Sequence, residues 1–220
     1  MDPIRSTNPT GSVDSRQANR TSNGTGESRK KQVYAFIDSQ NVNVSTQKFG
    51  WKMDWRKFRR FLKDKYGVTQ AFMFIGYVPE YEDMYEFLHD AGYSIVLKPT
   101  VDMSRPRETV AQPQPGEKAE AEEKKSVKGN VDAELVLWAM KELKNYDKAV
   151  IISGDGDFYC LVEYLSKQDK LLKLMPPNVH YSSLFKPYDK YIEHLGHHKR
   201  ELSYRDRRTS RDHRKKQEER

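Results

Sequence analysis

Two aspartates, Asp155 and Asp157, lie in a short turn directly after an apolar run, in the string SGDGDF at residues 153–158. Carboxylates two positions apart in a turn can converge on one cation, and the neighbouring glycines allow tight backbone geometry. Mg²⁺ and Mn²⁺ prefer hard oxygen ligands, usually one or two carboxylates completed by waters and phosphate oxygens. A cation held in this way acidifies a water molecule and neutralises a phosphoryl group, which is the chemistry of a nuclease.

Two further acids, Asp38 and Asp132, extend this candidate set. Asp38 follows the apolar run VYAFI at 33–37, and Asp132 falls at the start of a predicted helix. Taken singly, each aspartate has a structural explanation as a turn residue, a helix cap or a first-turn acid. Several carboxylates at one edge of a sheet would repel each other, however, and a bound cation resolves that conflict. The position of Asp132 depends on a chain connectivity that the sequence leaves open.

Other phosphate and nucleophile chemistries have less support. The chain has no GxxxxGK[ST] string, and its Gly-Asp-Gly stretch lacks the third glycine of a dinucleotide-binding fingerprint. The single cysteine, Cys160, excludes an intrachain disulfide and a multi-thiolate metal site. Because Cys160 lies among apolar residues, we expect a buried structural thiol there.

The elements around the acids alternate between strand and helix. Short apolar runs predict strands at 33–37, 68–78, 93–97, 149–152 and 171–175. Helical spacing of apolar residues predicts helices capped by Asp54, over 81–88, and from about Asn130 with Leu135, Ala139, Met140 and Leu143 inward. This alternation predicts an α/β fold with a mostly parallel sheet and helices on both faces. The functional crevice of such folds lies beyond the carboxyl ends of the strands, where Asp38, Asp155 and Asp157 fall.

Composition divides the 220 residues into one domain, two tails and an insertion. We expect a disordered tail at 1–31, a domain at 32–196 with a flexible insertion at 102–128, and a basic tail at 197–220. Residues 197–220 hold ten Lys or Arg against five Asp or Glu, and residues 31–196 hold 24 of each. The C-terminal segment is therefore either a solvated tail or an electrostatic arm for a polyanion.

The chain is too polar for a membrane protein, with 36% hydrophobic and 32% charged residues and no apolar run long enough for a spanning helix. Residues 1–31 contain no apolar segment typical of a secretory signal. We therefore expect a cytoplasmic protein.

Three strings in order carry a family resemblance: FIDSQN at 36–41, KGNVD at 128–132 and IISGDGDF at 151–158. Together they resemble the NYN domain, a PIN-like nuclease fold, and most closely its LabA-like (DUF88) branch, over about residues 32–195. The resemblance implies a Rossmann-like parallel sheet, a Mg²⁺ or Mn²⁺ site and hydrolysis of RNA phosphodiesters. It places Asp38, Asp132, Asp155 and Asp157 on the family's acidic positions and Asn41 on its DxxN asparagine.

One position departs from that pattern: many relatives carry a further acid six residues after the position of Asp132, where this chain has Trp138. We therefore hold two hypotheses. The first is a metal-dependent ribonuclease in which Asp38, Asp155 and Asp157 hold the ion, Asp132 completes the site or orients the water, and Asn41 donates or accepts a hydrogen bond with a ligand or phosphate. The second is an RNA-binding or regulatory module that keeps the fold without turnover. Single-stranded RNA is the expected partner, with Lys128 and the basic tail on its backbone. DNA stays an alternative substrate, and the sequence is compatible with a homo-oligomer.

Overall fold

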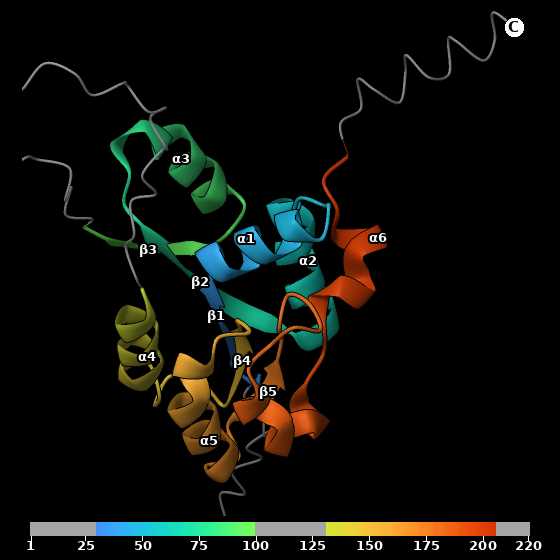
Figure 1. Cartoon of the computed structure of the whole chain (residues 1–220). Coiled ribbons are helices and arrows are strands. Elements are labelled where there is room, and N and C mark those ends of the chain that lie inside the picture. The colour runs from blue at the N-terminus through green and yellow to red at the C-terminus, as the bar shows by residue number, and fades with distance from the viewer. Residues whose placement is uncertain (1–29, 100–130, 206–220) are drawn as a thin grey trace, which may run out of the picture. The chain divides into compact units, whose positions relative to one another are not determined.

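A computed structural model of the chain describes residues 30–99 and 131–205. Its centre is one five-stranded sheet in the order β3-β2-β1-β4-β5, in which every neighbouring pair is parallel (Figure 1). The strands are β1 (Val33–Asp38), β2 (Val68–Gly76), β3 (Ser94–Lys98), β4 (Lys148–Ile152) and β5 (Leu171–Leu174). The α/β class with a parallel sheet is therefore confirmed, and each predicted strand is present within a few residues of its expected ends.

Helices cover both faces of the sheet. They are α1 (Ser39–Lys48), α2 (Trp55–Tyr66), α3 (Glu82–Asp90), α4 (Asp132–Lys141), α5 (Tyr159–Lys167) and α6 (Lys199–Leu202), with a 3₁₀ segment at Ser183–Tyr191. Side chains of α1, α2, α3 and α6 contribute to one buried cluster, and those of α4, α5 and the 3₁₀ segment contribute to another. Figure 1 shows α4 and α5 on the opposite side of the sheet from α1 and α2.

The alternation of side chains along β1 explains this two-sided core. Val33, Ala35 and Ile37 belong to the first cluster, whereas Phe36 belongs to the second. Successive residues of a strand point to opposite faces of the sheet, so a central strand with both faces covered must be apolar throughout. The ring of Phe36 stacks on Phe72 of β2 at a centroid distance of 5.5 Å, which joins the second cluster across two strands.

Helix α2 forms where the sequence predicts it. The carboxylate of Asp54 accepts a hydrogen bond from the Lys57 N–H, which satisfies one of the free donors at the helix start. Gly67 ends the helix in a left-handed conformation, with φ of 67°, that favours glycine. Phe58, Phe61 and Leu62 are buried on the inner face of the helix.

Two expectations about helix faces are wrong. Met140 was expected to face inward, but it is 37% exposed, because Leu135 and Ala139 already define the inner face of α4. Cys160 was expected to be a buried thiol, but it is exposed. On α5 the positions that point inward are Leu161, Val162 and Leu165, which leaves Cys160 on the solvent side.

The packed part of the chain continues past the expected boundary at residue 196. Leu202 of α6 is fully buried, and its carbonyl accepts a hydrogen bond of 2.8 Å from the Asp54 N–H at the start of α2. The Lys57 ammonium donates to the carbonyl of Ser203 over 2.8 Å. Residues 197–204 therefore belong to the fold and not to the tail, since one apolar side chain and several backbone hydrogen bonds fix them.

Several predictions fall outside the described residues. They are the N-terminal tail up to residue 29, the insertion at 102–128 with Lys128, the predicted helix start at Asn130, and residues 206–220. Among the helices that the structure describes, none is long and apolar enough to cross a membrane.

Candidate metal and phosphodiester site

The parallel topology brings the four predicted acids to one edge of the sheet. Asp38 is the last residue of β1, and Asp155 and Asp157 follow the end of the neighbouring strand β4. Asp132 is the first residue of α4, the helix that leads into β4. A crossover helix before a parallel strand must begin at the carboxyl edge of the sheet, so this connectivity brings Asp132 to the same edge as the other three.

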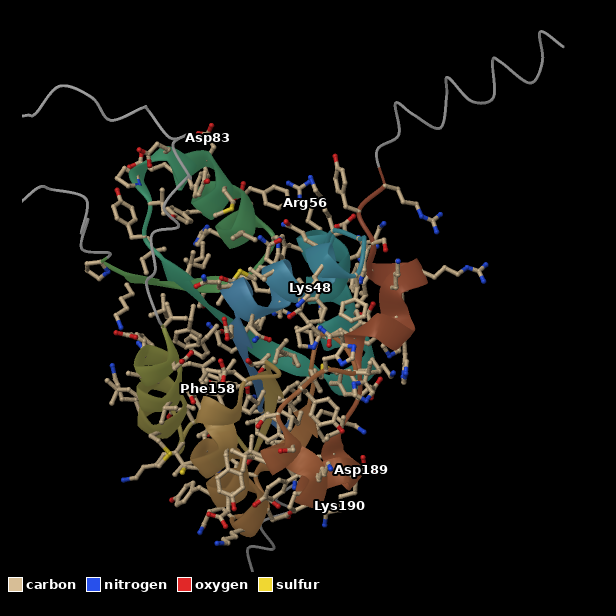
Figure 2. All side chains as sticks on the ribbon, in the orientation of Figure 1. Lys48, Arg56, Asp83, Phe158, Asp189 and Lys190 are labelled. Carbon is tan, nitrogen blue, oxygen red and sulfur yellow. The ribbon has the colours of Figure 1, made fainter. Side chains whose placement is uncertain are left out.

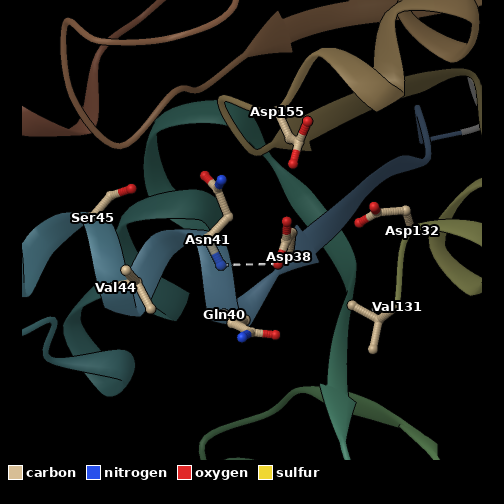
Figure 3. A pocket seen from close by; sticks show the side chains of 8 residues that line it. All are labelled: Asp38, Gln40, Asn41, Val44, Ser45, Val131, Asp132 and Asp155. Carbon is tan, nitrogen blue, oxygen red and sulfur yellow. Dashed lines mark hydrogen bonds between the residues drawn. The ribbon is translucent and has the colours of Figure 1, made fainter. Parts of the chain in front are cut away.

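A cavity of about 270 Å³ opens at this edge, between β1, α1 and the start of α4. It lies where the chain leaves the central strands β1 and β4 in opposite directions, which is the usual place of a functional crevice in an open parallel sheet. Figure 3 shows the carboxylates of Asp38, Asp132 and Asp155 pointing into a common space. The lining residues come from three segments of the chain: Asp38, Gln40, Asn41, Val44, Ser45, Val131, Asp132 and Asp155.

Three of the acids are close enough to share one ion. Asp132, Asp155 and Asp157 each offer one carboxylate oxygen, and these oxygens lie within 4.8 Å of one another. Asp38 faces the same cavity but is not a member of this trio among the described residues. The sequence hypothesis names all four acids as metal residues, with Asp38, Asp155 and Asp157 holding the cation and Asp132 completing the site or orienting the water. In the structure it is Asp132, and not Asp38, that lies closest to Asp155 and Asp157.

Asp38 is a buried carboxylic acid, only 5% exposed. Burial is the main reason that the pKa of Asp38 rises from 3.8 to about 6. The N–H of Asn41 and the hydroxyl of Ser153 donate to its carboxylate and lower the pKa, whereas the negative charges of Asp132 and Asp155 raise it further. Burial and the neighbouring negative charges thus destabilise the ionised form of Asp38, and a cation in the cavity would stabilise it.

Ser153 links two of the acids and was not singled out from the sequence. Its hydroxyl donates to a carboxylate oxygen of Asp38 over 3.2 Å and accepts from the backbone N–H of Asp155 over 3.1 Å. The side chain is fully buried. A serine directly before a Gly-Asp turn is a weak signal in a sequence, because the same residue is common in turns that have no site.

The turn that carries Asp155 and Asp157 is held from two sides. The side-chain oxygen of Asn41 accepts a hydrogen bond of 3.0 Å from the Gly154 N–H. On the other side, the carbonyl of Gly154 accepts a hydrogen bond of 3.0 Å from the backbone N–H of Ser182. Within the turn, Asp155 accepts from the N–H of Asp157 over 3.1 Å, so the two acids are placed relative to each other.

The glycines of this turn serve close packing and not an unusual backbone angle. Neither Gly154 nor Gly156 has a positive φ. A side chain at Gly156 would place its Cβ 2.5 Å from the Ser182 hydroxyl oxygen, and one at Gly154 would place its Cβ 3.3 Å from the Tyr181 Cβ. A Cβ at Gly156 therefore requires Ser182 to move, whereas a Cβ at Gly154 requires Tyr181 to yield by a few tenths of an ångström.

Trp138, at the position where the family resemblance suggests an acid, is partly buried and packs against the second cluster. Its ring lies 5.5 Å from that of Phe72 of β2, and the ammonium of Lys141 lies 4.4 Å above it. Glu134 pairs instead with Lys98 of β3 over 3.1 Å. Neither Trp138 nor Glu134 lines the cavity.

The donor set fits a hard divalent cation. It consists of carboxylate oxygens, without histidine or thiolate, which is the preference of Mg²⁺ and Mn²⁺. In the part of the chain that the structure describes, no salt bridge joins a lysine or arginine to Asp38, Asp155 or Asp157. The negative charges of these three aspartates are thus not offset by an ion pair with a lysine or arginine of residues 30–99 and 131–205.

Comparisons with known proteins bear on the family and the fold of the chain. The family model of the NYN domain matches residues 32–195. The chain is 25% identical over 174 residues to "Low amplitude and bright protein LabA" of Synechococcus elongatus, and the match covers 75% of this chain and 84% of that protein. Among solved structures, a protein of unknown function from Vibrio parahaemolyticus aligns with a TM-score of 0.58 at 20% identity, covering 76% of this chain and 94% of the other.

Proposed function

The chain belongs to the NYN domain family, and on that premise we propose that it is a divalent-metal-dependent ribonuclease that hydrolyses RNA phosphodiester bonds. Its similarity to LabA supports the LabA-like branch of the family. The observation that carries the proposal is the meeting of Asp132, Asp155 and Asp157 within 4.8 Å at the rim of a cavity that also contains Asp38. Acids gathered in this way repel each other unless a cation joins them.

In this proposal Asp132, Asp155 and Asp157 hold Mg²⁺ or Mn²⁺, and Asp38 adds its charge from the floor of the cavity. When bound, the cation supplies positive charge for the phosphoryl group and lowers the pKa of a water molecule. Ser153 and the backbone N–H of Asn41 keep the Asp38 carboxylate in one orientation by donating to it. All four acids and a Mg²⁺ or Mn²⁺ ion were expected from the sequence, and the two metals remain equal candidates in this proposal.

Asn41 has two roles in the proposal. Its side-chain oxygen is occupied by the Gly154 N–H, so it positions the turn that bears Asp155 and Asp157. Its amide NH₂ is then the group that it can offer to a phosphate oxygen in the cavity that it lines. The sequence hypothesis gave Asn41 only the second role.

Single-stranded RNA is the proposed substrate because members of the family act on RNA, and DNA stays an alternative for the test. A second candidate function is an RNA-binding module that keeps the acids without turnover. Trp138 favours this second candidate, since an apolar ring occupies the position at which the family pattern places a further acid.

The test compares the full chain with Asp155→Asn and with Asp83→Asn. Asp83, labelled in Figure 2, is an exposed acid on α3 that does not line the cavity, and it serves as the matched control. Each protein, after a check of folding by circular dichroism, is incubated with labelled single-stranded RNA or DNA of the same sequence in Mn²⁺, Mg²⁺ or EDTA. We expect the wild type and Asp83→Asn to cut RNA only with metal, and Asp155→Asn not to cut.

Two results would contradict the ribonuclease proposal. If the wild type binds RNA but releases no product under any metal condition, the binding module is the better description. If Asp155→Asn cuts as fast as the wild type, the carboxylate trio is not the catalytic site. Cleavage of DNA in preference to RNA would keep the chemistry and change the substrate.

A further inference from the structure

A second cavity lies next to the acidic one, on the other side of α1. It has a volume of about 280 Å³ and is lined by residues of α1, the carboxyl end of β2, the start of α2, and α3 with the loop before it. Gln40 lines both cavities, so they are neighbours around one residue of α1.

The lining of this second cavity is apolar below and polar at the rim. Met73 and Leu88 are buried and form its floor, and Trp55 forms part of the wall. Tyr81 and Met84 are exposed hydrophobic residues at its mouth. No lining residue carries a charge. A phosphate or another charged group would therefore meet no opposite charge among the lining residues, whereas a flat uncharged group would bury its faces.

The polar rim comes from α1. Gln40 and Asn43 both line the cavity and are exposed. The side-chain oxygen of Asn43 accepts from Gln47 over 2.9 Å, so its NH₂ remains the group that it can offer as a donor. Carboxamides provide donors and acceptors that match the edges of nucleobases, and aromatic or thioether side chains suit their faces.

We propose that this cavity is a nucleobase subsite, which receives the base of a nucleotide next to the phosphodiester held at the acidic cavity. The inference rests on the proposed function, since it takes RNA as the ligand of the neighbouring site. Nearby residues of α1 line the two cavities: Gln40 lines both, Asn41 lines the acidic one and Asn43 lines the apolar one. The two cavities therefore adjoin each other along α1, close enough for one nucleotide and its neighbouring phosphodiester to occupy both.

The test measures whether the cavity recognises bases rather than the backbone. Full-length Asp155→Asn, which we expect to bind without cutting, is titrated with a labelled oligouridine and with an abasic ribose-phosphate polymer of the same length. The same measurement is made after adding Tyr81→Ala and Met84→Ala. We expect the added changes to weaken binding of oligouridine about tenfold and to leave binding of the abasic polymer unchanged.

Phe87→Ala is the matched control. Phe87 lies on the same helix as Met84 and is exposed to a similar degree, 37% against 39%, but it does not line the cavity. Its ring packs instead under the guanidinium of Arg56, labelled in Figure 2, at 4.6 Å. Its removal is expected to leave both affinities unchanged. Asn43→Trp, which fills the mouth of the cavity from α1, provides a second variant if the alanine pair does not fold.

The outcomes separate this inference from the function on which it rests. A loss that is equal for both polymers, no loss at all, or no binding of oligouridine would overturn the subsite. If the wild type cuts oligouridine with metal while the cavity variants bind as the parent does, only the subsite is wrong. If the wild type does not cut but the loss is specific to bases, only the ribonuclease proposal is wrong.

Discussion

The side-chain oxygen of Asn41 accepts a hydrogen bond from the backbone N–H of Gly154 over 3.0 Å, across 113 positions of the sequence. This bond joins the first turn of α1 to the turn after β4, so the two chain segments that carry Asp38 and Asp155 are held together directly. The catalytic proposal depends on this link, because carboxylates share an ion only when their backbones are fixed.

Asn41→Ala is expected to lower the rate of RNA cleavage about 10- to 100-fold, as loss of a group that supports metal ligands usually does. It also leaves the Gly154 N–H without its acceptor, which costs about 1–3 kcal/mol of unfolding free energy where water does not replace it. Cleavage rates at several Mn²⁺ concentrations and urea unfolding measure the two effects. Asn145→Ala is the control, because Asn145 is an exposed asparagine that donates to Glu142 and lines neither cavity. Unchanged cleavage in Asn41→Ala would show that the turn is positioned without this bond.

The buried charge of Asp38 predicts a stability that depends on pH in the absence of metal. Because the pKa of Asp38 is raised from 3.8 to about 6, the folded protein holds this proton more tightly than the unfolded chain does. The contribution of Asp38 to the free energy of unfolding therefore falls as the pH rises from about 4 to about 6, and stays low above that. A shift of this size corresponds to roughly 3 kcal/mol as an upper figure.

Asp38→Asn removes this titration and keeps an oxygen that can accept from the Asn41 N–H. In EDTA at pH 7 the variant is expected to unfold at higher urea than the wild type, and the difference should shrink toward pH 4. The variant should also lose metal-dependent cleavage. Urea unfolding at closely spaced pH values measures the difference between the two proteins. If the difference in unfolding free energy between the two proteins stays constant from pH 4 to pH 7, the pKa of Asp38 is not raised.

Mutual repulsion among Asp132, Asp155 and Asp157 predicts that a divalent cation stabilises the fold. A ligand present at a hundred times its dissociation constant adds about 2.7 kcal/mol to the unfolding free energy, which amounts to several degrees in melting temperature for a domain of this size. We expect Mn²⁺ to raise the melting temperature of the wild type and of Asp83→Asn, but not that of Asp155→Asn. Samples with NaCl at matched ionic strength control for screening of charge. An equal rise in all three proteins would place the bound ion elsewhere.

The strands and the acidic positions were predictable because their signals are local. Each strand is a short apolar run, and a parallel sheet buried on both faces requires such runs. Asp38, Asp155 and Asp157 follow strands directly in the sequence, so the rule for carboxyl ends located them without a structure. Asp132 needed the observed topology, since its place at the same edge follows from the crossover that α4 makes into β4.

Helix α1 was not predicted, and its sequence explains why. Its ten residues, SQNVNVSTQK, are mostly polar, and only Val42 and Thr46 are buried. Asparagine, serine and β-branched residues have weak helix propensity. The helix forms because the carboxylate of Asp38 caps its N-terminus and because Val42 is buried in the first cluster. The bond between Asn41 and Gly154 and the link through Ser153 were equally out of reach, since they join residues far apart in the chain.

The C-terminal end of the fold was also misplaced, and it gives the last prediction. The charge of residues 197–220 suggested a tail, but Leu202 in this basic segment is fully buried against the cluster that contains α2. One leucine among charged residues gives no periodic signal, so only the packing reveals that the segment is anchored. Leu202→Ala is expected to lower the free energy of unfolding by about 2–4 kcal/mol, through lost burial and the cavity that remains. Urea unfolding measures this loss against Leu137→Ala, in which a leucine with 59% exposure is removed. Equal stability of the two variants would mean that α6 is not packed and would restore the boundary at residue 196.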